Sequence, residues 1–183
     1  MGYSDSLKKA WGALNVKQIP GKTSVKFLTD TYEINTLNRS IVSMSCNVEP
    51  KDYYKIIILH YLINEDRVLG LGDDDWMSFK EMDGGEVYFP AFRKRAIEPI
   101  IRKYGENPEL IFKRIDVLGA EKIDMGNAAI SIRIFPKIRV SIVLWAKDEE
   151  FPSECNMLFN RSARDILPTE DAAVLGGIIA SLV

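Results

Sequence analysis

The sequence predicts a single α+β domain spanning residues 1–183, built on a mainly antiparallel or mixed sheet with a buried central helix near residues 50–64. Three observations lead to this expectation. Apolar residues occupy nearly every face of segment 50–64, two later segments alternate apolar and polar residues, and no internal repeat or linker divides the chain. A chain of 183 residues is also long enough to bury a substantial core in one domain.

The N-terminal part is expected to form a short peripheral helix followed by a hairpin. Residues 6–13 are predicted to be helical, and Pro20-Gly21 ends that helix. Residues 24–28 and 32–37 are predicted to be two strands joined by a turn at 29–31.

The central helix is expected to begin at Pro50, because proline at the first helical position lacks only an N–H that would have no partner there. Its apolar side chains surround the helix axis, which is typical of a helix in the middle of a fold. They are Ile56, Ile57, Ile58, Leu59, Tyr61, Leu62 and Ile63.

Two further helices are expected near residues 91–104 and 107–118. Pro99 lies inside the first of them and predicts a kink or a break. Gly119 ends the second, because glycine readily adopts the left-handed conformation that closes helices.

The hydrophobic period then changes from helical to two. Residues 130–134 and 140–144 each alternate between apolar and mostly polar side chains, and only a short link joins them. This pattern predicts an antiparallel strand pair.

A last helix is expected near residues 169–182, and small residues line one of its faces. Ala172, Gly176 and Ala180 are four apart, so another backbone can come close to this face. Two interpretations stay open: the face packs against the protein's own sheet, or it is the contact of a homo-oligomer.

Charge and composition bear on the class of partner. The net charge of −2 provides no overall positive field, so neither nucleic acid nor an anionic membrane surface is expected as a partner. No apolar run reaches the ~18 residues of a membrane helix, and the N-terminus does not resemble a signal peptide. Cys46 and Cys155 lack metal-ligand spacing, which indicates free thiols and a cytoplasmic protein.

Residues 69–95 are the segment richest in special backbone and charge. Three consecutive carboxylates, Asp73, Asp74 and Asp75, precede a strand predicted at 76–79. They could bind a hard cation or a cationic partner, supply an acid/base pair together with Glu81 or Asp83, or form a solvated acidic turn. The spacing does not match an EF-hand loop, and no phosphate-binding glycine loop follows.

The helix predicted near 91–104 is locally basic. Arg93 and Arg95, with Lys94, Arg102 and Lys103, could bind phosphates or carboxylates. The same side chains could instead pair with the acidic segment inside the domain or remain solvated.

His60 is the only histidine and lies at helical spacing with the apolar residues of the central helix. It is interpreted as a core histidine with one hydrogen-bond partner, or as an axial ligand of a metal or tetrapyrrole. Asp73, Asp75 and His60 are therefore weak metal-ligand candidates. One histidine and two scattered cysteines do not build a zinc or iron–sulfur site within this chain.

Four motifs carry a family resemblance: GDDDWMSFKEMDGG, YFPAFRKRAIEP, LWAKDEEFPSECNMLFNRSA and LPTEDAAVLGG. Together they resemble the uncharacterised prokaryotic family called domain of unknown function 3786, over residues 5–183. Relatives carry Asp in an LFDxSA motif where this chain has Asn160, so the resemblance implies no charged role at this position. Some relatives carry an added four-cysteine iron–sulfur module, which implies a setting in anaerobic corrinoid and one-carbon chemistry but no established activity.

Three functions follow as hypotheses. The leading one is a non-catalytic domain that binds a cofactor or a partner protein through segments 70–95 and 151–161, both expected to be rich in loops. The second is an enzyme that uses Asp73–Asp75 and Glu81, with Arg93 or Arg95 holding an anionic substrate. The third is a structural homo-oligomer. The sequence identifies no cofactor. The candidate binding residues are Asp73, Asp74, Asp75, Trp76, Glu81, Arg93, Arg95, Asn160 and Arg161.

Overall fold

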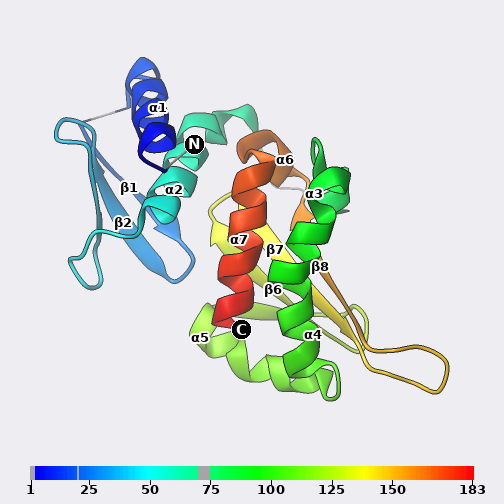
Figure 1. Ribbon diagram of the computed structural model, residues 1–183. Coiled ribbons are helices and arrows are strands. Elements are labelled where there is room, and N and C mark those ends of the chain that lie inside the picture. Colours follow the sequence, from blue (N-terminus) through cyan, green and yellow to red (C-terminus); the bar gives the residue numbers. More distant parts are fainter. Residues whose placement is uncertain (1–2, 20, 70–74) are drawn as a thin grey trace.

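The structure is a computed structural model that describes residues 3–19, 21–69 and 75–183 (Figure 1). Helices are combined with two antiparallel sheets, so the predicted α+β class is confirmed. A three-stranded sheet has the order β1-β2-β3, and a five-stranded sheet has the order β4-β8-β7-β6-β5. Buried residues from both parts belong to one continuous hydrophobic core.

The N-terminal helix α1 (Tyr3–Val16) is longer than predicted. Ala10, Trp11 and Leu14, on one helical face, are buried in the core, and Leu14 lies beyond the predicted end at residue 13. This buried face of α1 is therefore part of the core, and only the opposite face of the helix is peripheral.

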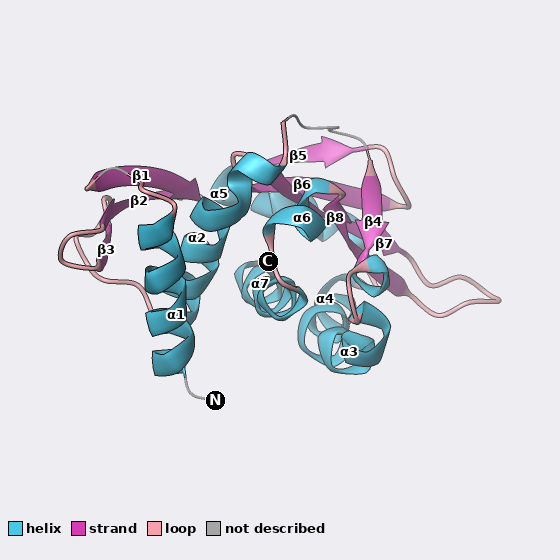
Figure 2. Cartoon of the chain, turned by 90° about the horizontal axis from the view of Figure 1, so that it is seen from above, coloured by secondary structure: helices cyan, strands magenta, loops and turns pink. Residues whose placement is uncertain are grey.

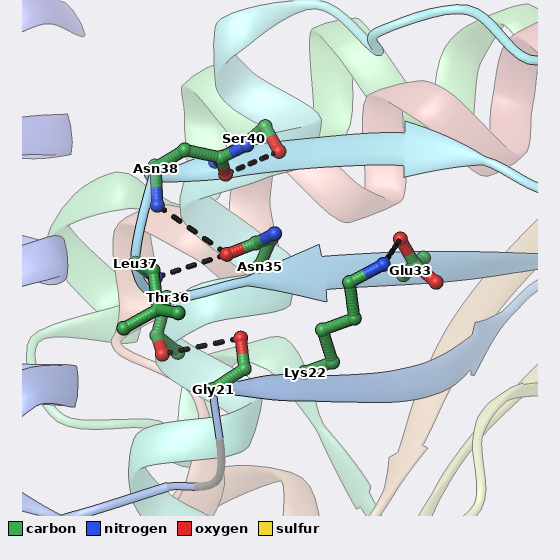
Figure 3. A network of polar contacts seen from close by, with 8 residues as sticks. All are labelled: Gly21, Lys22, Glu33, Asn35, Thr36, Leu37, Asn38 and Ser40. Carbon is green, nitrogen blue, oxygen red and sulfur yellow. Dashed lines mark hydrogen bonds and ion pairs between the residues drawn. The ribbon is translucent and has the colours of Figure 1, made fainter.

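The predicted hairpin is present as β1 (Lys22–Phe27) and β2 (Asp30–Asn35). A third strand, β3 (Ser40–Ser43), continues this sheet and was not predicted. Figure 3 shows the turn before it, where Oδ1 of Asn35 accepts the backbone N–H groups of Leu37 and Asn38 at 3.0 and 3.3 Å. Oδ1 of Asn38 in turn accepts the Ser40 hydroxyl at 2.7 Å. Hydrogen bonds to asparagine side chains fix this turn, and the hydrophobic pattern of the sequence does not reveal turns of this kind.

The central helix α2 (Asp52–Asn64) is buried as predicted, with Ile57, Ile58 and Leu59 almost fully enclosed. It begins at Asp52, so Pro50 precedes the helix instead of opening it. The ring of Tyr61 stacks on Phe135 of the five-stranded sheet, with centroids 4.2 Å apart. A short 3₁₀ turn, η1 (Glu65–Arg67), follows.

The five-stranded sheet contains β4 (Trp76–Ser78), β5 (Ala120–Ile123), β6 (Ala128–Phe135), β7 (Ile138–Trp145) and β8 (Glu154–Asn160). The predicted antiparallel pair is β6 and β7, with Ile132 opposite Val140. Both faces of this pair are largely buried, so Ser131 and Ser141 are buried as well.

The expectation that residues 151–161 are rich in loops is wrong, because most of them form the strand β8. Cys155, Met157 and Phe159 alternate along β8 and are buried. Cysteine and methionine are less typical of strands than the β-branched residues of β6, so this alternation is a weak sequence signal for a strand.

The helix predicted near 91–104 is the C-terminal part of a longer helical segment. It consists of α3 (Gly85–Phe92), the π-helical turn η3 (Arg93–Ile97) and α4 (Glu98–Tyr104). Pro99 has no N–H to donate, and just before it the N–H of Glu98 donates to Arg93, five residues back. The predicted disturbance at Pro99 is therefore a π-turn rather than a break.

The segment predicted as a helix near 107–118 is a 3₁₀ helix, η4 (Pro108–Arg114), followed by one α-helical turn, α5 (Ile115–Leu118). Pro108 and Ile111 are three apart and both buried, which suits three residues per turn. Gly119 ends α5 in the left-handed conformation, as predicted.

The C-terminal helices are α6 (Ser162–Ile166) and α7 (Thr169–Leu182). In both views α7 lies between α2 on one side and α3 with α4 on the other, and these helices cover one face of the five-stranded sheet (Figures 1 and 2). The small-residue face of α7 meets the π-turn. A Cβ at Gly176 would lie 2.4 Å from a ring carbon of Phe92 and 3.1 Å from the Cβ of Ala96.

Candidate functional site

The structure separates the candidate residues that it describes into three places. One group surrounds the pairing of β4 with β8 and holds Asp75, Trp76, Glu81, Asn160 and Arg161. Arg93 lies in a neighbouring groove, whereas Arg95 lines another cavity, beside α2 and α7. Asp73 and Asp74 lie outside the described residues.

Asp75 and Arg161 are joined at the start of β4. Nε of Arg161 donates to Oδ2 of Asp75 at 2.7 Å, and the Arg161 backbone N–H donates to the Asp75 carbonyl at 2.9 Å. Beside them, Trp76 pairs with Asn160 in the strand ladder. Its hydrogen bond to the Asp75 carboxylate raises the pKa of Arg161 further above its ordinary value. Because about half of each side chain is exposed, this ion pair contributes little stability and serves mainly to hold the two segments together.

Glu81 is part of a capping box at the 3₁₀ turn η2 (Phe79–Glu81). The backbone N–H of Ser78 donates to Oε2 of Glu81 at 2.7 Å. This bond, followed by that of the Ser78 hydroxyl, holds the pKa of Glu81 below its ordinary value. Glu81 is thus an ionised cap of a turn, which is the opposite of what a general acid near neutral pH requires.

Asn160 is fully buried and all its polar atoms have partners. Its Oδ1 accepts the Arg139 backbone N–H at 3.0 Å, and its Nδ2 donates to the Lys137 carbonyl at 3.1 Å and to Oγ of Ser162 at 2.7 Å. The amide joins the β6–β7 turn to the end of β8. A carboxylate here would place an acceptor against the Lys137 carbonyl, so the geometry requires a donor at this position.

A groove lies where β4 ends. β4 pairs with Leu158, Phe159 and Asn160 of β8, and after Ser78 the chain turns away into η2. Among the described residues, no strand pairs with the outer edge of 154–157. A cavity of about 350 Å³ occupies the space beside this edge. Its lining consists of Ser78, Phe79, Lys80, Phe89, Arg93, Ile97 and residues 154–158.

The groove carries more positive than negative charge. Arg93 is exposed, and within the described part of the chain it makes no hydrogen bond or ion pair. Nζ of Lys80 lies 4.4 Å from the ring centroid of Phe89. Glu154 is the single carboxylate among the described lining residues.

The lining of the groove includes one thiol, that of Cys155. Burial raises the pKa of the Cys155 thiol to about 12, although the charge of Arg93 acts in the opposite direction. A thiol that stays protonated is a poor nucleophile. Asp83, another proposed acid, is paired with Arg164 at 2.9 Å instead of facing the groove.

His60 is partly buried in α2, and its Nδ1 lies 2.5 Å from Oδ2 of Asp171 in the first turn of α7. It therefore has one hydrogen-bond partner, and the pair joins two helices. In the ranges 3–19, 21–69 and 75–183, no three His, Cys, Asp or Glu side chains gather as a metal site would require.

Residues 6–181 match the model of a family described as domain of unknown function (DUF3786). The chain belongs to this family. The resemblance drawn from the four sequence motifs is thereby confirmed, and the DUF3786 match covers nearly the whole chain. No curated protein and no solved structure matches it. Within the described residues of this DUF3786 protein, no helix has the length and apolar character needed to cross a membrane.

Sequence reasoning pointed to the two segments that line the groove in this DUF3786 protein, but it named neither Lys80 nor any residue of 154–157 as a candidate. The signal that could have found the edge is the alternation of Cys155, Met157 and Phe159. The strand that carries this alternation has seven residues, whereas the Trp76–Ser78 strand beside it has three.

Proposed function

We propose that the protein is a non-catalytic binding module and that an extended, acidic segment of a partner protein adds to its five-stranded sheet along β8. The observation that carries this proposal is the mismatch between neighbouring strands. β8 has seven residues and β4 has three, which leaves the edge 154–157 without a partner among the described residues, beside an accessible groove.

Unpaired strand edges are normally protected in proteins, because their N–H and C=O groups pair readily with another chain. Peptides that add to such an edge gain affinity from main-chain hydrogen bonds and specificity from pockets for alternate side chains. Here the half-buried Phe89 offers apolar surface to inward-facing side chains, and Arg93 and Lys80 offer positive charge to acidic ones.

The charge of the groove favours an acidic segment over a basic one. Arg93 has no described ion-pair partner, so a carboxylate that reached it would gain a charge-assisted bond without displacing another. Enzymatic use of the same region is less well supported, because Asp75 and Glu81 are engaged in structural bonds and the Cys155 thiol is protonated.

The setting of this binding is also a proposal. The family resemblance supports a partner among corrinoid or iron–sulfur proteins of one-carbon metabolism, for which this chain would be an accessory. A cytoplasmic location agrees with two free cysteines, of which Cys155 is buried and Cys46 exposed.

The test is a titration of ¹⁵N-labelled protein with a synthetic peptide of alternating glutamate and valine, acetyl-TEVEVEVT-amide. The expected result is saturable shifts of the amide resonances of residues 154–157 and of the side-chain resonance of Arg93. The same peptide with lysine in place of glutamate is the matched control and is expected to cause much smaller shifts.

Two variants sharpen the test. Arg93→Glu is expected to abolish the response to the acidic peptide, whereas Lys94→Glu, an equal charge change at an exposed neighbour that does not line the groove, is expected to preserve it. Equal shifts with both peptides, or no shifts near β8 at millimolar peptide, would overturn the proposal.

A further inference from the structure

A second cavity, of about 310 Å³, lies away from the β8 groove. α2 and α7 form two of its walls, and the N-terminal turn of α1 and the π-turn contribute the others. The lining of this cavity includes Tyr3, Tyr53, Tyr54, Arg95, Gly177 and Ser181, and aliphatic side chains of α7 complete it.

The two long walls are fixed relative to each other. The bond between His60 and Asp171 joins α2 to α7 at 2.5 Å. Tyr53 precedes His60 by seven residues and therefore lies on the same face of α2, two turns nearer the cavity. A cavity whose walls are held in this way is largely preformed, which lowers the entropic cost of binding.

One wall is aromatic. The ring centroids of Tyr53 and Tyr54 are 5.0 Å apart, and those of Tyr3 and Tyr53 are 6.2 Å apart. Tyr54 also meets Phe27 edge to face at 5.3 Å, which anchors it to the core. Burial raises the pKa of Tyr54, so its phenol remains a neutral donor. Tyrosines in this arrangement present flat apolar faces with polar tips, which suits a planar ring.

The opposite wall is open at one point. A Cβ built on Gly177 would have no heavy atom within 4 Å, whereas the adjacent Gly176 is packed tightly against Phe92. α7 therefore uses one glycine for internal packing and leaves the other facing empty space. This space is where a flat ligand would lie.

The charge of the cavity comes from Arg95. It is exposed, and the part of the chain that the structure describes offers it no hydrogen bond or ion pair. Among the described lining residues there is no carboxylate. A guanidinium in this state binds a planar carboxylate through two parallel hydrogen bonds.

We propose that this cavity is a binding site for a small planar aromatic carboxylate, with the ring between the tyrosine wall and Gly177 and the carboxylate on Arg95. The volume of about 310 Å³ is at the lower end of the range of about 300–1,000 Å³ for ligand pockets, which restricts the ligand to one or two fused rings. This site is independent of the β8 groove.

Isothermal titration calorimetry with indole-3-acetate tests the proposal. Two analogues separate its parts: tryptophol replaces the carboxylate by a neutral hydroxymethyl group, and cyclohexaneacetate replaces the aromatic ring by a saturated one. We expect indole-3-acetate to bind with a dissociation constant below a millimolar and both analogues to bind at least tenfold more weakly.

Variants of the lining residues locate the site. Arg95→Gln and Gly177→Leu are expected to weaken binding of indole-3-acetate at least tenfold, the first by removing the charge and the second by filling the open space. Arg102→Gln, an exposed arginine outside the cavity, is the control and is expected to bind as the native protein does. Circular dichroism verifies that each variant is folded.

Three outcomes would contradict a site for an aromatic carboxylate in this cavity. Undetectable binding of indole-3-acetate at five millimolar to the native protein would overturn the proposal. So would equal binding of tryptophol, or unchanged affinity in folded Arg95→Gln or Gly177→Leu.

Discussion

Two adjacent glycines of α7 should respond in opposite directions to the same substitution. Gly177→Ala is expected to raise the free energy of unfolding by about 1 kcal/mol, because alanine has the higher helix propensity and restricts the unfolded chain. Nothing in the structure opposes the change, since a Cβ at Gly177 meets no heavy atom within 4 Å.

Gly176→Ala gains the same propensity but must fit a methyl group where a Cβ would lie 2.4 Å from Cε2 of Phe92. Phe92 cannot easily move, because it is buried and stacks on Phe79 with centroids 4.0 Å apart. Overpacking of a core costs about 1–3 kcal/mol, so a cost near 2 kcal/mol outweighs the propensity gain and leaves a net loss of about 1 kcal/mol.

Equilibrium unfolding in urea measures both changes, provided that the slope with denaturant stays constant. The two variants should differ by about 2 kcal/mol, with the native protein between them. Equal stabilisation by both substitutions would refute the close contact between α7 and the π-turn. Gly177→Ala also provides a matched reference, since it shares the helix and the chemical change.

Three further predictions concern buried or capping polar groups. Asn160→Asp should lower the free energy of unfolding by about 1–3 kcal/mol at pH 7, and the deficit should shrink as pH falls and be smallest below about pH 4, where the introduced carboxyl is protonated in both states. His60→Leu should cost about 1–3 kcal/mol because Asp171 loses its partner while its side chain is only 10% exposed. Glu81→Gln should be less stable than the native protein at pH 7 and equally stable at low pH, measured by urea unfolding across pH.

The pH dependence of stability in Glu81→Gln and Asn160→Asp follows from how folding shifts the pKa of each carboxyl. The pKa of Glu81 is lowered in the folded protein, so its contribution is present above the unfolded value and is lost as pH falls through the folded one. The carboxyl introduced at position 160 affects stability in the opposite way. Burial against a carbonyl raises its pKa, so it destabilises the folded protein at high pH and much less at low pH. A deficit for Asn160→Asp that grows at low pH would contradict this account. An unchanged stability of His60→Leu would show that its bond to Asp171 does not hold α2 and α7 together.

Much of the fold could be predicted because its elements carry strong periodic signals. The apolar ring of α2 and the alternation in β6 and β7 are such signals, and both elements lie where they were expected. β8 was missed because its inward residues include Cys155 and Met157, which are weak indicators of a strand. β3 was missed because its position depends on asparagine bonds in a turn rather than on a hydrophobic pattern.

The candidate site was predictable only in part. Sequence placed Arg93 and Arg95 on one helix, but the segment turns them toward different cavities. The capping role of Glu81 was within reach of the sequence, because Ser78 and Glu81 have the S-x-x-E spacing of a capping box. The edge of β8 that lacks a partner among the described residues results from the difference in length between β4 and β8. These two strands are about 80 residues apart in the sequence, so local sequence patterns do not reveal this difference.

The central claim is that the outer edge of β8 is free to accept a strand. Amide hydrogen exchange, followed residue by residue, tests it most directly. We predict that the amides of residues 154–157 that do not donate to β7 exchange much faster than those of β6, and that the glutamate–valine peptide slows them selectively. Slow exchange along the whole of β8 before any peptide is added would show that the edge is already paired and would contradict the account.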